Sequence, residues 1–224
     1  MKVFAMGLAF VLFAASACAQ RLVSIPVAGT AAHIEADLYG SGDRAVLLAH
    51  GGRFHKESWR AQAQQLAANG FLVLAIAFRG DGFNSDGTPA AMGSDEDNAT
   101  DVFAAANYLH SLNLKSIAAI GASLGGDAVG NAQARSAVFD RMVFLGSEGG
   151  NAPEKLAGSK LYLVARDDAS GSGPRLPGIT LHFARAPQPK RMVVVDGSAH
   201  AQYLFASDQG PRVLSEIFTF LAEK

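Results

Sequence analysis

The sequence is almost free of cysteine and has no excess of positive charge. Cys18 is the single cysteine among 224 residues, which excludes an intramolecular disulfide. Charged residues make up only 17% of the chain, and 19 basic against 20 acidic side chains leave a formal charge of −1. This balance argues against nucleic acid or an anionic membrane surface as a partner.

Motifs for nucleotide and metal binding are also missing. Residues 121–126, Gly-Ala-Ser-Leu-Gly-Gly, lack the second glycine of G-x-G-x-x-G, and no loop carries G-K-[ST]. The acidic residues 95–97 open a predicted helix, where carboxylates complement the helix dipole, so we interpret them as solvated side chains and not as metal ligands. We therefore expect neither a metal nor another cofactor.

The first 19 residues differ from the rest of the chain. After one lysine they are mostly small and apolar, and they end in Ala-Ser-Ala-Cys-Ala. The run is too short to span a bilayer and is typical of a secretory signal peptide cleaved after Ala17 or Ala19. We therefore expect export to the periplasm or the medium. The ending also partly resembles a lipobox, but the residue three before Cys18 is alanine where a large aliphatic residue is usual, so we favour a chain without a lipid anchor.

Residues 20–224 have the length of one α/β domain with a single sizeable core. Apolar runs predict strands at 23–27, 33–38, 44–50, 71–78, 115–120, 141–145, 161–165 and 192–195, and helical spacing predicts helices at 57–69, 95–112, 124–135 and 211–222. The first two strands are predicted to form an antiparallel edge. Residues 152–156 are assigned to a short turn or helix. Residues 169–190, rich in Gly, Pro and Ser, are expected to form a flexible border with at most a short element at 179–184.

Strands that alternate with helices predict an α/β fold with a mainly parallel central sheet and helices on both faces. Ligands of such sheets bind outside the carboxyl ends of the strands. Each catalytic group should therefore follow directly after a strand.

Ser123 meets this condition within the pattern G-x-S-x-G. Gly121 and Gly125 stand two residues either side of it, between a predicted strand and a predicted helix. This pattern is typical of a nucleophilic serine on a sharp turn, exposed at the N-terminus of a helix where negative charge is stabilised. We predict that Ser123 is the nucleophile of a serine hydrolase.

A nucleophilic serine needs a base, and histidine is suited to it by a pKa near neutrality. His200 lies in the loop Asp196–Ala201 directly after the last predicted strand, and we assign the base to it. The other five histidines are interpreted as structural or surface residues: His33, His50, His55, His110 and His182. His50, at the end of a strand, is expected to brace the following loop through hydrogen bonds.

The histidine in turn needs an acid to orient it. Asp167 and Asp168 follow the strand at 161–165 and lie between Ser123 and His200 in sequence. We prefer Asp168, because a carboxylate further from the strand end has more freedom to turn towards the histidine. Glu148, after the strand at 141–145, is a third candidate.

The oxyanion hole is expected to combine two backbone N–H groups. One is that of Leu124, directly after the nucleophile, and the other comes from the loop after His50. Gly52 is our choice there, with Arg53 as the alternative.

The order Ser, acid, His, each after its own strand, resembles that of the α/β hydrolases, and residues 21–224 are similar to the dienelactone hydrolases and small serine esterases. His50-Gly51 with Trp59 nine residues on, and the loop at 79–87, are similar to signatures of this family, although the loop is one residue longer here. The resemblance implies hydrolysis of a small acyl substrate by an esterase, thioesterase, dienelactone hydrolase or peptidase. Only fifteen residues separate Leu145 from Leu161, so no large cap domain and an open site are expected.

A non-catalytic protein of the same fold, binding a small ligand or a partner, is the alternative. Such proteins usually have a broken set of catalytic residues. The complete set in this sequence favours an enzyme.

Overall fold

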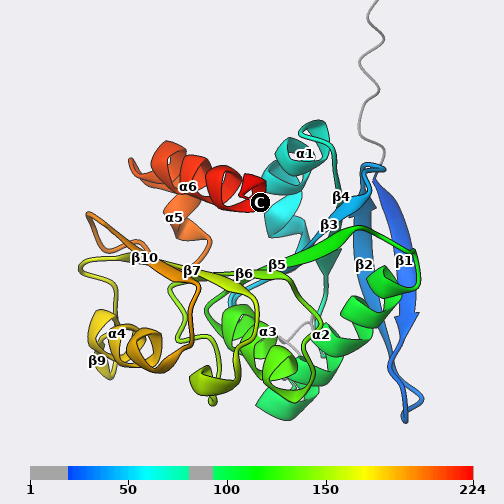
Figure 1. Cartoon of the computed structure of the whole chain (residues 1–224), viewed down its shortest axis with the longest axis horizontal. Coiled ribbons are helices and arrows are strands. Elements are labelled where there is room, and N and C mark those ends of the chain that lie inside the picture. The colour runs from blue at the N-terminus through cyan, green and yellow to red at the C-terminus, as the bar shows by residue number, and fades with distance from the viewer. Residues whose placement is uncertain (1–19, 81–92, 224) are drawn as a thin grey trace, which may run out of the picture.

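A computed structural model describes residues 20–80 and 93–223 (Figure 1). The predicted signal peptide at 1–19, with Cys18, lies outside the described residues, as does most of the signature loop at 79–87.

One eight-stranded sheet organises the chain, with the strand order β1-β2-β4-β3-β5-β6-β7-β10. From β4 to β10 all neighbours pair in parallel, whereas β2 is antiparallel to both β1 and β4, which confirms the predicted antiparallel edge. The bounds are β1 Arg21–Pro26, β2 His33–Tyr39, β3 Arg44–Ala49, β4 Phe71–Ile76, β5 Ser116–Ala122, β6 Arg141–Leu145, β7 Ser159–Ala165 and β10 Lys190–Val195.

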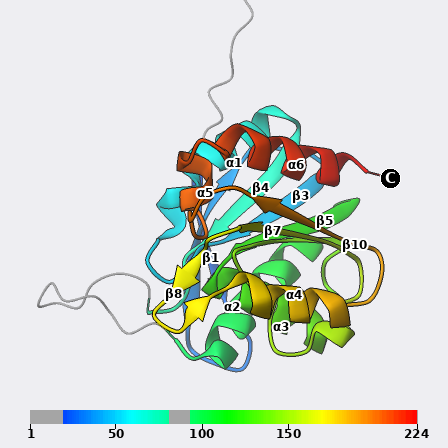
Figure 2. The ribbon, with the colours of Figure 1, turned by 90° about the vertical axis from the view of Figure 1, so that its left-hand side faces the viewer.

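Helices cover both faces of this sheet (Figures 1 and 2). On one face lie α1 (Arg60–Ala68), α5 (Tyr203–Ala206) and α6 (Gly210–Ala222), and on the other lie α2 (Asp95–His110), α3 (Leu124–Arg135) and α4 (Leu176–Arg185). A separate hydrophobic cluster fills each interface. Every residue of β4 is buried, as expected for a strand that has helices on both sides.

The helix boundaries differ in detail from the predicted ones. The helix expected at 57–69 is divided into a 3-10 turn, η1 (Lys56–Trp59), and α1. The turn expected at 152–156 is a second 3-10 turn, η2 (Pro153–Lys155). No other helix lies between β6 and β7, so the described chain has no cap domain there. Within 20–80 and 93–223, no helix has the length and apolarity needed to cross a membrane.

The segment at 169–190 is more ordered than its composition suggests. It forms a hairpin of β8 (Ala169–Ser170) and β9 (Gly173–Pro174), followed by α4. The expectation of a flexible border was wrong, because Ile179 is only 1% exposed and Phe183 packs edge-on against Tyr162. Ile179 and Phe183 are four residues apart and therefore share one face of the helix, a spacing that the surrounding glycines and prolines concealed.

Candidate active site

The predicted site residues all follow strand ends at the carboxyl edge of the sheet. Ser123 follows β5, Asp168 follows β7, His200 follows β10, and Gly52 follows β3. These strands are parallel, so their carboxyl ends lie along the same edge.

Ser123 has a backbone conformation that side chains rarely adopt, with φ 49° and ψ −120°. The residues two positions before and after it, Gly121 and Gly125, must be glycines for steric reasons. A Cβ on Gly121 would lie 2.5 Å from the Gly125 oxygen, and one on Gly125 would lie 2.3 Å from the Ala49 oxygen. The close contact between β3, β5 and α3 therefore explains the G-x-S-x-G pattern and presents the Ser123 side chain at the helix N-terminus.

A hydrogen-bonded chain links the three predicted side chains. The Ser123 hydroxyl lies 2.9 Å from His200 Nε2, and His200 Nδ1 lies 2.7 Å from Asp168 Oδ2. With the ring proton on Nδ1, His200 donates to Asp168 and accepts from Ser123. Gly146, with φ 57°, makes room for this pair, since a Cβ there would lie 3.0 Å from both the Asp168 carboxylate and the His200 ring.

Of the three candidate acids, the structure brings only Asp168 to His200. Asp168 is fully buried and its second oxygen, Oδ1, lies 3.5 Å from Arg175 Nε. Asp167 is exposed and its backbone N–H bonds to the Gly197 oxygen. Glu148 is also exposed and instead lies 3.2 Å from His182 Nε2.

The remaining histidines have other partners. His50 is fully buried and its Nδ1 lies 2.9 Å from the Gly51 oxygen, which supports its predicted role as a brace of that loop. His110 bonds through Nε2 to the Val138 oxygen at 3.0 Å, and His33 lies 3.4 Å from the Ser24 hydroxyl.

The two residues predicted to supply the oxyanion donors lie next to each other. Leu124 is the first residue of α3, where backbone N–H groups have no partner within the helix. Gly52 lies against Leu124, because a Cβ on Gly52 would be 3.6 Å from Leu124 Cδ1. Arg53, the alternative, is an exposed residue one position further along the same loop.

Gln202 joins the histidine loop to the loop after β3. Its side chain is 6% exposed, accepts a hydrogen bond from the Gly51 N–H at 2.9 Å, and donates to the Ser58 hydroxyl at 2.6 Å. Sequence reasoning missed this residue, since Gly51 and Gln202 are 151 positions apart. The one available signal was a polar residue two positions after the candidate base.

A polar cavity of about 260 Å³ opens beside Ser123. Its lining consists of Ser123, Asp127, Gly146, Ser147, Glu148, Arg175 and Ile179. Sequence reasoning singled out Ser123 as the nucleophile and Glu148 as a candidate acid, and it missed the other five residues. Asp127 Oδ1 accepts hydrogen bonds from the Ser147 hydroxyl at 2.8 Å and the Gly150 N–H at 3.2 Å. Burial raises the pKa of the Asp127 carboxyl, and the charge of Glu148 adds to this, although the bonds from Ser147 and Gly150 act in the opposite direction.

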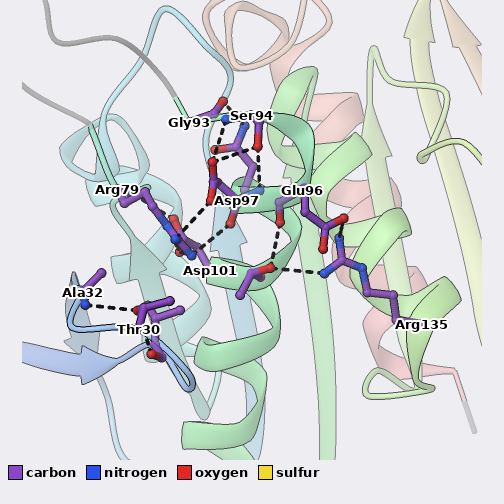
Figure 3. A network of polar contacts seen from close by, with 12 residues as sticks. Thr30, Ala32, Arg79, Gly93, Ser94, Glu96, Asp97, Asp101 and Arg135 are labelled. Carbon is purple, nitrogen blue, oxygen red and sulfur yellow. Dashed lines mark hydrogen bonds and ion pairs between the residues drawn. The ribbon is translucent and has the colours of Figure 1, made fainter.

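Arg79, just after β4, is anchored to α2 (Figure 3). Its Nε donates to Oδ1 of the buried Asp101 at 2.8 Å, and its Nη1 lies 3.1 Å from Asp97 Oδ1. Asp97 also accepts from the N–H of Ser94, the N-cap of α2, in a capping box. Of the acidic residues that open this helix, Asp97 is thus a cap and ion-pair partner and Glu96 pairs with Arg135, whereas Asp95 is exposed as expected. Within the described residues, no group of three or more His, Cys, Asp or Glu side chains is arranged to hold a metal ion.

A serine on a strand–turn–helix, hydrogen-bonded through histidine to a buried aspartate at the carboxyl edge of a parallel sheet, defines the α/β-hydrolase class. The model of the family described as serine aminopeptidase, S33, matches residues 40–166, and the chain belongs to this family.

Solved structures share the same fold. The dienelactone hydrolase from Anabaena variabilis has a TM-score of 0.75 at 19% identity, covering 91% of this chain and 97% of its own. The Pyrococcus furiosus esterase Pf2001 has a TM-score of 0.73 at 14% identity, covering 92% and 94%. The esterase RhEst1 from Rhodococcus has a TM-score of 0.69 at 18% identity, covering 91% and 98%. No curated protein matches the chain in sequence.

Proposed function

We propose that this chain is a serine hydrolase that cleaves an ester or a related acyl bond of a small molecule through an acyl-enzyme intermediate. The observation that carries the proposal is the chain of hydrogen bonds from Ser123 through His200 to Asp168, at 2.9 and 2.7 Å. Membership of a hydrolase family and the strained conformation of Ser123 support it.

In the first half of the reaction, Ser123 Oγ attacks the carbonyl carbon while its proton passes to His200 Nε2. The carbonyl oxygen becomes an oxyanion, which the N–H groups of Leu124 and Gly52 stabilise. When this tetrahedral intermediate collapses, the bond to the leaving group breaks and His200 donates its proton to the leaving group. Asp168 stays ionised throughout, holds the ring and stabilises its positive charge.

Water completes the reaction with the roles reversed. His200 takes a proton from the water, whose oxygen attacks the acyl carbon and forms a second oxyanion in the same place. Collapse breaks the bond to Ser123 Oγ, which recovers its proton from His200, and the carboxylic acid leaves. Nucleophile, base, acid and oxyanion donors all come from this chain, so the proposal needs no cofactor.

A fluorophosphonate probe tests the proposal, because it reacts with serines that a neighbouring base activates. We expect one covalent adduct, which peptide mapping places on Ser123. The Ser123→Ala variant, folded by circular dichroism, should not react. A folded native protein that carries no adduct at Ser123 would sink the proposal.

We further propose that residues 1–19 direct export and are then removed. The sequence pattern given above supports this. N-terminal sequencing of the exported protein should begin at Cys18 or Gln20, and an unmodified Cys18 by mass spectrometry would agree with the absence of a lipid anchor. Met1 on the exported protein would contradict removal.

A further inference from the structure

The cavity beside Ser123 has an unusual lining for a site that accepts hydrocarbon. Three of its seven lining residues are charged, Asp127, Glu148 and Arg175, and Ile179 is its one large apolar residue. At about 260 Å³ it lies below the roughly 300 to 1,000 Å³ of pockets that enclose drug-sized ligands. Its size therefore fits a short substituent and not a long chain.

The position of the cavity determines which part of a substrate enters it. Under the proposed function, on which this inference rests, His200 must donate a proton to the leaving group and so lies beside it. The cavity is lined by Ser123 but not by His200, Gly52 or Leu124. The group that occupies it is therefore the acyl part of the substrate, which remains attached to Ser123 after the leaving group has gone.

Both carboxylates retain capacity to accept hydrogen bonds. Among the described residues, the hydrogen bonds that Asp127 accepts from Ser147 and Gly150 both end on Oδ1, and the Gly149 N–H also stabilises this carboxylate. A carboxylate has about four acceptor positions, so Asp127 can still accept a bond from a ligand. Glu148 pairs through Oε2 with His182, while its side chain stays 48% exposed. Arg175, the cation of the cavity, is directed at Asp168, with its Nε 3.5 Å from Oδ1.

An apolar acyl chain would be poorly matched to this lining. It would displace water from the two carboxylates and offer them no hydrogen bond in return, which costs free energy. Asp127 is already disfavoured as an anion, because burial and the charge of Glu148 raise the pKa of its carboxyl. A ligand that donates a hydrogen bond would replace the water lost from the carboxylates and would stabilise the ionised form of Asp127.

We propose that the cavity is the acyl subsite and that it selects a short acyl group carrying a hydrogen-bond donor, a hydroxyl or an ammonium, in reach of Asp127 and Glu148. Hydroxyl and ammonium share this chemistry, and only the ammonium adds a charge.

Three isosteric 4-nitrophenyl esters test the proposal: butyryl, 3-hydroxypropionyl and β-alanyl. They place a methyl, a hydroxyl and an ammonium group at the same position, and share one leaving group. Each kcat/KM is divided by the rate constant of hydroxide hydrolysis to remove differences in intrinsic reactivity. We expect the normalised value of at least one donor-bearing ester to exceed that of butyryl by about tenfold or more, since sites built around polar groups reject analogues that lack the partner. The ester with the raised normalised kcat/KM shows whether the preferred donor is a hydroxyl or an ammonium group.

Two substitutions link this preference to the cavity. Glu148→Gln and Asp127→Asn preserve size, and Asp127→Asn keeps an oxygen that can accept from Ser147 and Gly150. Each should reduce the ratio of donor-bearing to butyryl ester by about threefold or more, a readout that a general loss of folding would not move. Asp167→Asn is the matched control, an exposed aspartate outside the cavity, and should leave the ratio unchanged. If Asp127→Asn does not fold, Glu148→Gln decides.

The outcomes separate this inference from the proposed function. If the normalised kcat/KM of the butyryl ester equals or exceeds that of both donor-bearing esters, the proposed acyl subsite is wrong. The proposal that the chain is a serine hydrolase is unaffected by that result. A preference that survives both substitutions also overturns the proposed acyl subsite. No hydrolysis of any ester together with no fluorophosphonate adduct removes the proposed function, and the subsite with it.

Discussion

Asp168 and Asp167 are adjacent in sequence but differ completely in surroundings. Asp168 is buried and bonds to His200 at 2.7 Å, whereas Asp167 is exposed. Asp168→Asn should therefore lower kcat by about 10⁴-fold, because the amide no longer holds the required His200 tautomer. Asp167→Asn should stay within about twofold. Steady-state kinetics with a 4-nitrophenyl ester measures both, and equal losses in the two variants would contradict the assignment.

Under the proposed function Gln202 is a positioning residue, because it accepts a hydrogen bond from Gly51 N–H and so holds the loop that carries the proposed oxyanion donor Gly52. Gln202→Leu removes this bond and should displace the loop, which lowers kcat by about 10- to 100-fold. KM should change little, since the displaced donor acts mainly on the transition state.

Gln202→Glu is the matched control, because its carboxylate can still accept from Gly51. It should recover part of the lost kcat. A purely structural role for Gln202 would instead lower the free energy of unfolding in Gln202→Leu and leave kcat of the folded fraction unchanged.

Asp127 lowers the free energy of unfolding as pH rises, whereas most aspartates in folded proteins do the opposite. Its pKa is raised in the folded protein, so the folded state binds more protons than the unfolded state between the ordinary value and the raised one. Stability from this group is therefore present below the ordinary aspartate pKa of about 3.9 and is lost as pH rises through the raised value.

The Asp127→Asn variant has no carboxyl group at this position, so its stability does not depend on the ionisation of residue 127. The free energy of unfolding of the variant, relative to the native protein, should rise between pH 4 and pH 7. Urea unfolding at several pH values measures the difference, and Asp167→Asn should show no such trend. A constant difference would contradict the raised pKa.

Among the elements, α4 connects the site to the core. Ile179 lines the cavity and is also part of the hydrophobic cluster on that face of the sheet. At the other end of the helix, Lys190 Nζ donates to the Phe183, Ala184 and Ala186 oxygens at 2.6 to 2.9 Å, where a cation complements the helix dipole. The helix is thus fixed at both ends and cannot be treated as a loose border.

Truncating the buried face of α4 should therefore destabilise the fold. Ile179→Ala is expected to lower the free energy of unfolding by about 2 to 4 kcal/mol, from lost burial and the cavity left behind. Leu181→Ala on the same helix is the control, since Leu181 is 61% exposed, and it should cost no more than about 0.5 kcal/mol. Equal costs in urea unfolding would show that α4 does not pack as described.

At the scale of the whole molecule, the sequence was most informative about the sheet. Buried strands such as β4 are apolar throughout and helices such as α6 are amphipathic, so alternation alone predicted the parallel sheet. The order of Ser123, Asp168 and His200, each after a strand, predicted the three residues that the fold joins by hydrogen bonds.

Other parts of the site could not be predicted, because they depend on contacts distant in sequence. Gln202 is placed by Gly51, and Asp127 becomes a cavity residue only because β6 brings Ser147 beside it. Nothing local distinguishes such residues from ordinary polar side chains. The helix α4 was hidden for a different reason, since Pro177 and Gly178 lie in its first turn, where proline is tolerated.

The strained backbone of Ser123 lowers the free energy of unfolding of the whole chain. Its φ of 49° and ψ of −120° suit glycine, and forcing a residue with a Cβ into such a region costs of order 1 to 3 kcal/mol. Ser123→Gly should thus melt at a higher temperature than Ser123→Ala, although both lack the hydroxyl. Under the proposed function, the residue that gives the chain its activity therefore lowers its melting temperature. Thermostable variants obtained without selection for hydrolysis should then include changes at Ser123.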